Sequence, residues 1–301
     1  MKKLLSLVLA LALVCALMVT VHAESAPTVL QVSVPSSLRE GAKIPVFLTL
    51  PEAPDAATGL VIMIHGHGGN HNEWGGFDAI SGGVAEAGKI VATLDFPGCG
   101  DSAESFQLNT MTNMKQDVLD VIAYVQETYG VDDVAAFGYS MGGRIILELL
   151  AEEKAAFSAV EFVAPAEDYE DLKGLFGGPE AWEELSKTAH EEGFVVFTTI
   201  YGQVQELSAA WFDDLAKYPD GLAEAAKAKY EGSAIVIYAT DDEAVHPDIS
   251  QGVADVFGCK VINTYTAGHS YSFYSDDPDV VSTVNGNSIA YLADPAAFLA
   301  E

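Results

Sequence analysis

The segment GYSMG at positions 138–142 has the spacing of a turn that presents a nucleophilic serine. A buried strand is predicted before it at 134–137, and the helix-forming run RIILELL follows at 144–150. In such a strand–turn–helix the hydroxyl is exposed, and the first N–H groups of the helix point toward it. The flanking glycines fit the crowding of the turn, because a side chain at either position would clash. Ser140 is therefore the predicted nucleophile.

A glycine-rich loop, HGHGGN at 65–70, directly follows the first predicted buried strand. Its backbone N–H groups could meet an oxyanion. We predict that the N–H groups of His67 and of Met141, the residue after the serine, form the oxyanion hole. The side chains of His65 and His67 are expected to hydrogen-bond within the loop. A zinc site that adds His71 would need an acidic or cysteine partner, and none has ligand-like spacing nearby, so no metal is expected.

A histidine that could act as general base follows the last predicted strand, at 260–265. His269 lies in the loop TAGHS, where it could accept the serine proton and return it to a leaving alcohol. Three other histidines compete for this role: His71 in the glycine-rich loop, His190 in the middle of the chain and His246 at a helix start. Because only His269 lies in a loop after the final strand, it is the predicted base.

Two neighbouring carboxylates, Asp241 and Asp242, follow the strand predicted at 234–239. A carboxylate in a loop at a strand end can orient an imidazole and stabilise its cation. The alternative is an ordinary acidic loop in an acidic protein. The residue types alone do not choose between the two aspartates.

The elements that must position these groups alternate along the chain. Apolar runs without polar alternation read as buried strands at 59–65, 90–95, 134–137, 159–164, 234–239 and 260–265. Amphipathic segments lie between them, such as the helix predicted at 114–127 and closed by Gly130. This alternation indicates an α/β fold, with a mostly parallel central sheet and helices on both faces. An antiparallel pair at 28–34 and 44–50 is expected at the edge of the sheet.

Residues 167–232 break the alternation, with no clear strand except at 193–200. The region is rich in aromatic residues: Tyr169, Phe176, Trp182, Tyr201, Trp211 and Phe212. An insertion between two core strands, at the carboxyl end of the sheet, is where a lid over a site would lie. A helical embellishment that covers the sheet elsewhere is the alternative. We favour a lid, because aromatic side chains provide pocket wall as well as packing.

The N-terminus is typical of a cleaved signal peptide at residues 1–23. A lysine pair precedes a long apolar run, and the ending VHA supplies the small residues of a cleavage site. A transmembrane anchor is the alternative, because the run approaches a bilayer-spanning length. A lipoprotein signal at Cys15 is disfavoured by the valine before it. We expect an exported protein, secreted or extracytoplasmic, with a single domain at 24–301 and no membrane attachment after cleavage.

Composition excludes several classes of partner. The formal charge is −30 at pH 7, and removal of two lysines with the signal peptide lowers it to −32. Such a surface repels phosphate backbones, so nucleic-acid binding is not expected. Half of the residues are apolar, which indicates a cored globular protein. Cys99 and Cys259 are too few for a disulfide framework; they could form one bridge or remain two thiols.

These motifs together resemble the α/β-hydrolase superfamily over nearly the whole chain that follows the signal peptide. In that superfamily the loop after the first long strand often reads HGxxG, as at 65–69. The next strand commonly ends DxxGxGxS, as at 95–102, although Cys99 stands where histidine is common. The resemblance implies an α/β-hydrolase fold with a lid insertion at about 167–232.

The acid turn of this superfamily usually reads GxxDxxV. Aligned with 239–245, where Ala239 replaces the glycine, it selects Asp242. The order Ser140, Asp242, His269 is also that of the superfamily and differs from the orders in trypsin-like and subtilisin-like proteases. The resemblance therefore implies a catalytic triad of these three residues.

Within the superfamily, the chain is most similar to the bacterial cinnamoyl (feruloyl) esterases and their carboxylesterase relatives. The similar segments lie at 95–102, 109–118, 163–166 and 268–273. The resemblance implies a secreted serine esterase that needs no cofactor and acts through an acyl-enzyme. Its substrate would be a small-molecule or carbohydrate-linked ester, such as a hydroxycinnamoyl (feruloyl) ester of plant carbohydrate. Polar lid residues bind the phenolic hydroxyl in those esterases, and Asp171 and Tyr201 are the candidates here.

Three other functions would use the same residues. A serine peptidase would share the triad, and an acyltransferase would pass the acyl group to an alcohol in place of water. A non-catalytic binding protein would bind a ligand without becoming acylated. The sequence favours the esterase and leaves the oligomeric state open.

Overall fold

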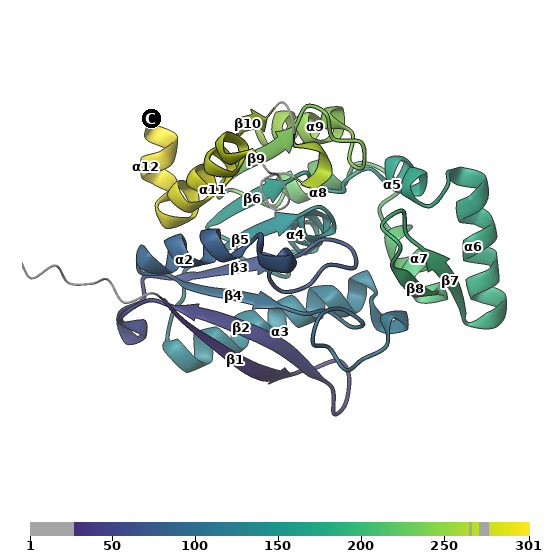
Figure 1. The fold of residues 1–301 in the computed structure, drawn as a ribbon, viewed down its shortest axis with the longest axis horizontal. Coiled ribbons are helices and arrows are strands. Elements are labelled where there is room, and N and C mark those ends of the chain that lie inside the picture. The colour runs from purple at the N-terminus through teal and green to yellow at the C-terminus, as the bar shows by residue number, and fades with distance from the viewer. Residues whose placement is uncertain (1–26, 265–266, 271–276) are drawn as a thin grey trace, which may run out of the picture.

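The computed structural model describes residues 27–264, 267–270 and 277–301, so the predicted signal segment lies outside the described residues. Within these residues the central sheet has eight strands in the order β1-β2-β4-β3-β5-β6-β9-β10 (Figure 1). The strands are β1 (Thr28–Pro35), β2 (Lys43–Leu50), β3 (Leu60–Ile64), β4 (Ile90–Leu94), β5 (Val134–Tyr139), β6 (Ala159–Val163), β9 (Ser233–Ala239) and β10 (Lys260–Thr264). Each strand of this sheet was predicted from the sequence.

The direction of the strands confirms a mostly parallel sheet. β1 pairs antiparallel with β2, and β2 pairs antiparallel with β4, whereas the strands from β4 to β10 run parallel to one another. Every residue of β3, β4, β5 and β6 is buried. A strand covered on both faces has no solvent side, which explains why these segments read as continuous apolar runs.

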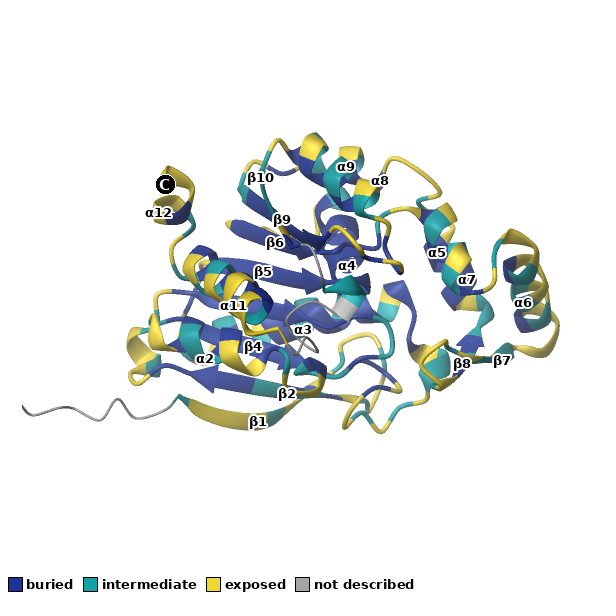
Figure 2. Cartoon of the chain, turned by 45° about the horizontal axis from the view of Figure 1, so that its top comes forward, coloured by how far each residue is buried: buried dark blue, intermediate teal, exposed yellow. Residues whose placement is uncertain are grey.

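Helices cover both faces of the sheet (Figures 1 and 2). On one face α2 (Asp78–Glu86) packs against α11 (Pro278–Ala293), and α11 also contacts the last helix, α12 (Pro295–Ala300). The other face carries α3 (Met111–Tyr129), α4 (Met141–Ala151), α8 (Leu222–Lys227) and α9 (Pro247–Phe257), which contact one another in that order. Gly130 ends α3 in a left-handed conformation, as predicted.

The insertion after β6 forms a separate body beside the sheet, toward the right of Figure 1. Its elements are α5 (Tyr169–Leu175), α6 (Pro179–Glu192), the antiparallel hairpin of β7 (Phe194–Thr198) and β8 (Val204–Ser208), and α7 (Ala209–Leu215). β8 was not predicted, because VQELS alternates polar and apolar residues over only five positions. The helix α8 packs on α4, so the chain has already returned to the sheet before residue 232.

The insertion has its own small aromatic core. The rings of Phe176, Trp182, Phe197, Trp211 and Phe212 contact one another with centroids between 4.7 and 5.4 Å apart. Pairs in this range attract one another beyond the effect of their buried area. Four of the six aromatic residues that marked this region in the sequence therefore help to hold it together, whereas Tyr201 is 69% exposed.

Short 3-10 turns complete the fold at Pro54–Ala56, Glu73–Gly75, Phe106–Leu108 and Gly268–Ser270. In the part of the chain that the structure describes, none of the helices combines the length and apolar character needed to cross a bilayer.

Candidate active site

Ser140 lies in a sharp turn between β5 and α4, with φ of 54° and ψ of −115°. A residue with a side chain is strained at such a positive φ and stays there only where its surroundings hold it. Here the Ser140 N–H donates to the Val163 carbonyl at 2.8 Å, and the Ser140 carbonyl accepts from the Ala166 N–H at 3.0 Å. The turn is thus fixed to the end of β6 and to the first residues beyond it.

The two glycines of the turn are required by space. A Cβ at Gly142 would lie 2.2 Å from the Ile64 carbonyl oxygen, and one at Gly138 would lie 2.6 Å from the Gly142 carbonyl oxygen. Side chains do not tolerate such distances, so the crowding predicted from the sequence is present.

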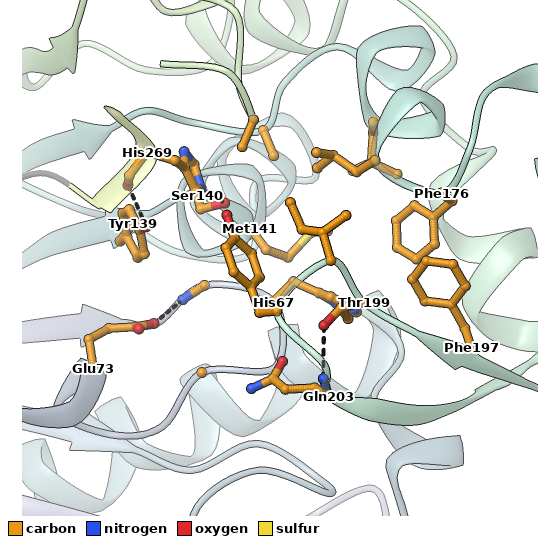
Figure 3. Close-up of a pocket in the computed structure, with 18 of the residues that line it drawn as sticks. His67, Glu73, Tyr139, Ser140, Met141, Phe176, Phe197, Thr199, Gln203 and His269 are labelled. Carbon is orange, nitrogen blue, oxygen red and sulfur yellow. Dashed lines mark hydrogen bonds between the residues drawn. The ribbon is translucent and has the colours of Figure 1, made fainter. Parts of the chain in front are cut away.

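The imidazole of His269 lies beside the predicted nucleophile, Ser140 (Figure 3), and its other nitrogen meets the predicted acid, Asp242. Its Nε2 lies 3.0 Å from Ser140 Oγ, and its Nδ1 lies 2.9 Å from Asp242 Oδ2. Both distances are within hydrogen-bond range. Ser140 and Asp242 are 102 positions apart in the chain, and Asp242 and His269 are 27 apart. The fold thus brings three distant residues into one continuous line of proton donors and acceptors.

The two neighbouring aspartates, Asp241 and Asp242, make different hydrogen bonds. Asp242 is buried, and its Oδ1 accepts the N–H groups of Ala244 and Val245, each at 2.9 Å, which aims Oδ2 at the imidazole. The Oδ1 of Asp241 instead accepts the N–H groups of Ala267 and Gly268, at 3.2 and 3.0 Å. Asp241 therefore holds the backbone just before His269, whereas Asp242 meets the ring.

Tyr139 supports the histidine from the other side. Its hydroxyl donates to the His269 carbonyl oxygen at 2.6 Å, and its ring stacks on the imidazole with centroids 5.2 Å apart. Sequence reasoning missed this contact, since Tyr139 occupies an unrestricted position of the GxSxG pattern. No local signal could have identified it.

The two predicted oxyanion donors lie beside the serine. Met141 is the first residue of α4, and His67 lies in the glycine-rich loop 65–70, which we call the oxyanion loop; both line the same cavity as Ser140. Among residues 27–264, 267–270 and 277–301, neither backbone N–H donates a hydrogen bond. Both groups are therefore available to an oxyanion, and their catalytic role stays a prediction.

The oxyanion loop is braced from the side of the sheet. The buried carboxylate of Glu73 accepts the Gly66 N–H at 2.7 Å, and Glu73 itself has a φ of 47°. His65 Nδ1 donates to the Gly66 carbonyl at 2.7 Å. Burial lowers the pKa of His65 to about 4, so the ring is neutral at pH 7. The side chain of His65 thus has the structural role predicted for it, whereas Glu73 was missed because it resembles any acidic residue.

The DxxGxGxS segment also has a structural role. The carboxylate of Asp95 accepts the backbone N–H groups of His71 at 2.6 Å and Asp101 at 2.8 Å. Burial alone would raise the pKa of Asp95, but hydrogen bonds from His71 and Asp101 hold it below its usual value. A Cβ at Gly100 would lie 2.1 Å from this carboxylate, so the glycine lets the loop close around it.

A cavity of about 460 Å³ opens above Ser140 between the sheet and the insertion (Figure 3). Its wall on the side of the insertion is largely apolar and consists of Ala166, Leu172, Leu175, Phe176, Phe197, Thr199, Ile200, Tyr201 and Gln203. The insertion therefore forms one wall of the cavity above Ser140, and we refer to it as the lid. Of the two candidate substrate residues, Tyr201 lines the cavity and Asp171 does not.

The lid is tied to the helix that follows the serine. Arg144 is fully buried on α4, and its guanidinium donates to backbone carbonyls at both ends of the lid. The acceptors are Ala166 at 3.3 Å, Glu167 at 2.8 Å, Leu215 at 3.2 Å and Tyr218 at 3.2 Å. Its Nε also faces Glu148 at 3.2 Å. Both junctions of the lid are therefore fixed relative to Ser140.

The other histidines and the cysteines lie outside this arrangement. His190 is exposed on α6 next to Asp213, and His246 caps α9. Within the described residues, no cluster of three or more His, Cys, Asp or Glu side chains could hold a metal ion. Cys99 and Cys259 are both thiols, and burial raises the pKa of Cys99 to about 12.

Comparison with known proteins adds three findings. The sequence profile described as the alpha/beta hydrolase family matches residues 61–284. Est1E from Butyrivibrio proteoclasticus with bound ferulic acid is similar in structure, with a TM-score of 0.68 and 19% identity over 88% of this chain and 99% of that one. A carboxyl esterase from Bacillus coagulans has a TM-score of 0.70 and 15% identity, over 88% and 98%. At these identities the likeness concerns the fold.

Two curated relatives are similar to this chain over only part of their own length. The dihydrolipoyllysine-residue acetyltransferase component of the acetoin cleaving system from Cupriavidus necator is 26% identical over 57% of this chain and 43% of its own length. Its counterpart from Pseudomonas putida is 24% identical over 38% and 29%. The chain thus spans less than half the length of these relatives.

Proposed function

Because the chain belongs to the alpha/beta hydrolase family, we propose that it is a serine hydrolase that cleaves carboxylic esters. The observation that carries the proposal is the line of contacts from Ser140 through His269 to Asp242, with distances of 3.0 and 2.9 Å. It lies at the floor of a cavity whose lid side is apolar, which suits an ester with an apolar acyl or aryl group.

The first half of the proposed reaction forms an acyl-enzyme. Ser140 Oγ attacks the ester carbonyl while His269 Nε2 takes its proton, and Asp242 stabilises the imidazolium. The negative charge on the carbonyl oxygen meets the N–H groups of His67 and Met141, each worth on the order of 3 kcal/mol in the transition state. His269 then gives its proton to the leaving alcohol as the C–O bond breaks.

The second half returns the enzyme to its starting state. Water attacks the acyl-enzyme, and His269 takes a proton from it. The same two N–H groups stabilise the second tetrahedral intermediate. His269 then protonates Ser140 Oγ as the bond to the acyl carbon breaks, which releases the carboxylic acid.

Hydroxycinnamoyl (feruloyl) esters of plant carbohydrate are the substrate class that we propose first. Phe176 and Phe197 provide aromatic walls in the lid, and Tyr201 lines the cavity while most of its side chain is exposed. A flat aromatic acyl group could stack on such walls. The structural likeness to Est1E with bound ferulic acid supports this choice.

The test compares the wild-type protein with Ser140→Ala on p-nitrophenyl butyrate. We expect turnover by the wild type and none above background by the variant; equal rates would contradict the proposal. A panel of methyl ferulate, acetylated xylan oligomers and p-nitrophenyl acetate then assigns the acyl group. A preference for acetyl over feruloyl esters would refute the feruloyl assignment alone.

Acyl transfer to an alcohol is a second candidate, favoured by the curated relatives that are named acetyltransferase components. A transferase would form the same acyl-enzyme and pass the acyl group to an acceptor. Added glycerol or a sugar would then divert product from the acid to a new ester. Product that stays fully hydrolysed would support the esterase.

We also propose that the protein is exported after cleavage behind Ala23. The proposal is supported by the signal-like composition of residues 1–23, which lie outside the described residues. Mass spectrometry of the protein recovered outside the cytoplasm should give an N-terminus at Glu24. An intact Met1 in that fraction would contradict the proposal.

A further inference from the structure

A glutamine occupies an inward-facing position of the lid hairpin, where an apolar residue would be expected. Along β8 burial alternates, and Gln205 and Leu207 face inward with exposures of 3% and 0%. A buried amide costs free energy unless it is hydrogen-bonded. Among the described residues the amide nitrogen of Gln205 has no hydrogen-bond partner, so the contact of its oxygen must explain why the residue is there.

Two glutamines of the lid hairpin, Gln205 on β8 and Gln203 in the turn before it, contact the oxyanion loop. Gln205 Oε1 lies 2.8 Å from His67 Nε2, and Gln203 Nε2 donates to the Gly68 carbonyl at 3.0 Å. Figure 3 shows Gln203 beside His67 in the wall of the cavity. Two successive residues of the oxyanion loop are thus hydrogen-bonded to the lid.

The backbone of Gly68 accommodates this close approach. Its φ is +68°, and a Cβ built on it would lie 2.5 Å from Gln205 Nε2 and 2.8 Å from Gln203 Oε1. Only glycine leaves room for both amides at this point. Gly68, the fourth residue of the HGHGG pattern, therefore serves the contact with the lid.

The bond to Gln205 fixes the orientation of the His67 ring. Burial lowers the pKa of His67 to about 4, so at pH 7 the ring is neutral and donates from Nε2 to Gln205 Oε1. Its Nδ1 is buried without a hydrogen-bond partner among the described residues. The ring otherwise packs against Phe106, Phe176 and Trp211, with centroids 5.5 to 5.9 Å away.

The oxyanion loop is therefore held from two sides. From the side of the sheet, Glu73 fixes the Gly66 N–H. From the lid, Gln205 fixes the side chain of His67 and Gln203 fixes Gly68. The predicted oxyanion donor, the N–H of His67, lies between these two attachments.

We propose that Gln205 is a positioning residue: it holds the imidazole of His67, and through it the backbone N–H of His67, in place above Ser140. The inference rests on the proposed function and deepens it, because the lid then completes the oxyanion hole as well as covering the substrate. A small displacement of a catalytic group is costly; a shift of about 1 Å can reduce the rate roughly 100-fold.

The first test is Gln205→Leu, with Gln107→Leu as a matched control. Gln107 donates to Glu206 at 2.8 Å, so the control removes a hydrogen bond to the same strand at the next residue. For Gln205→Leu we expect kcat on p-nitrophenyl butyrate to fall about 10-fold with KM changed less than about twofold. Inhibition by butylboronic acid, which mimics the tetrahedral intermediate, should weaken by the same factor. Gln107→Leu should keep the wild-type values.

His67→Phe provides the second variant and closes a double-mutant cycle. It keeps the ring and the backbone N–H but removes the bond, so it should lower kcat as Gln205→Leu does. In the His67→Phe background, Gln205→Leu should then cost nothing more, because their shared bond is already gone. Thermal unfolding confirms that each variant is folded, and Gln205→Met replaces Gln205→Leu if the latter is not.

Three results would overturn the inference. The first is a wild-type kcat in Gln205→Leu. The second is an equal loss of kcat when Gln205→Leu is made in the wild type and in His67→Phe, which would indicate a general weakening of the lid. The third is a higher KM for Gln205→Leu with unchanged kcat and unchanged boronate inhibition. If instead the wild-type protein hydrolyses no ester, the proposed function itself fails, which is a separate outcome.

Discussion

The two halves of the cavity are built on different principles. On the side of the sheet, backbone groups hold Ser140 and Asp242, and the Asp242 carboxylate receives two N–H bonds of 2.9 Å. The side chains of Tyr139 and Asp241 hold the backbone at His269. On the side of the lid, a two-stranded hairpin with exposed apolar residues is held by an aromatic cluster; Ile200 and Val204 are 74% and 70% exposed. The proposed chemistry and the proposed choice of substrate therefore depend on separate parts of the chain.

The separation is not complete, because two contacts join the halves. Arg144 ties both ends of the lid to the helix that begins after Ser140. Gln205 ties the hairpin to the oxyanion loop. Substitutions on the side of the sheet should therefore lower the rate of hydrolysis equally for every ester, whereas substitutions in the lid should change the selectivity between esters. Substitutions at the two joints, Arg144 and Gln205, should do both.

The largest expected effect is on the side of the sheet, in Asp242→Asn. An amide in this position cannot stabilise the imidazolium and favours the wrong tautomer, so kcat should fall about 10⁴-fold. The loss should be the same for p-nitrophenyl acetate and methyl ferulate, measured by steady-state kinetics. Asp241→Asn is the matched control, because its amide oxygen can still accept the N–H groups of Ala267 and Gly268; it should lose less than about 10-fold. Equal losses in the two variants would contradict the assignment of the acid.

The second prediction concerns the joint at Arg144. Arg144→Met leaves four carbonyls and part of Glu148 without a partner, so the free energy of unfolding should fall by about 3–5 kcal/mol in urea denaturation. Lys154→Met removes an exposed ion pair to Glu152 on the same side of the fold and should change stability by less than about 0.5 kcal/mol. If Arg144→Met is as stable as the control, the guanidinium is not what holds the lid.

The third prediction concerns Glu161 on β6, in the core of the sheet and away from the lid. Burial raises the pKa of Glu161 from 4.5 to about 8, and Ser288 on α11 donates to its carboxyl group. Between these values the folded state keeps a proton that the unfolded chain has released, so stability falls as the pH rises from about 5 to about 8. Glu161→Gln should remove this decline, which is about 3–4 kcal/mol.

Urea unfolding at pH 5 and pH 8 measures this effect. Glu183→Gln, an exposed position on α6 in the lid, is the control and should keep the wild-type decline. Because Glu161 lies in the core of the sheet, Glu161→Gln should leave the ratio of rates on methyl ferulate and p-nitrophenyl acetate unchanged. A decline that persists in Glu161→Gln would show that another group causes it.

The smallest expected effect lies in the lid, in Tyr201→Ala. Tyr201 lines the cavity but is 69% exposed, so its loss should raise KM for methyl ferulate about threefold, which corresponds to less than about 1 kcal/mol. KM for p-nitrophenyl acetate should not change. Val204→Ala alters an exposed residue of the same hairpin outside the cavity wall and should change neither value. A loss shared by both esters would mean that the lid does not confer selectivity.

Much of the sheet side of the molecule could be predicted from the sequence. The strands, the turn at Ser140 and the meeting of Ser140, Asp242 and His269 were predictable, because each follows from a local pattern at a strand end. Gly138 and Gly142 signal their crowding directly. The choice of Asp242 over Asp241 needed the resemblance to a family, since the two residues differ only in what their carboxylates contact.

The contacts of the lid could not be predicted in this way. Gln205 and His67 are 138 positions apart, and nothing near either residue indicates the other. β8 is short and half polar, so its pairing with β7 depends on the aromatic cluster around it. Outside the lid, Tyr139 contacts the backbone of His269, 130 positions away, and Glu73 contacts that of Gly66 in the adjoining loop; neither residue type carries a sign of its contact.

The most direct test of the account is covalent labelling of Ser140. A fluorophosphonate reacts only with a serine that an adjacent base activates, and mass spectrometry of the digested protein identifies the labelled residue. We predict one adduct, on the peptide that contains Ser140, lost in Ser140→Ala and strongly slowed in His269→Ala. No labelling of the folded wild-type protein, or labelling at another serine, would contradict the account.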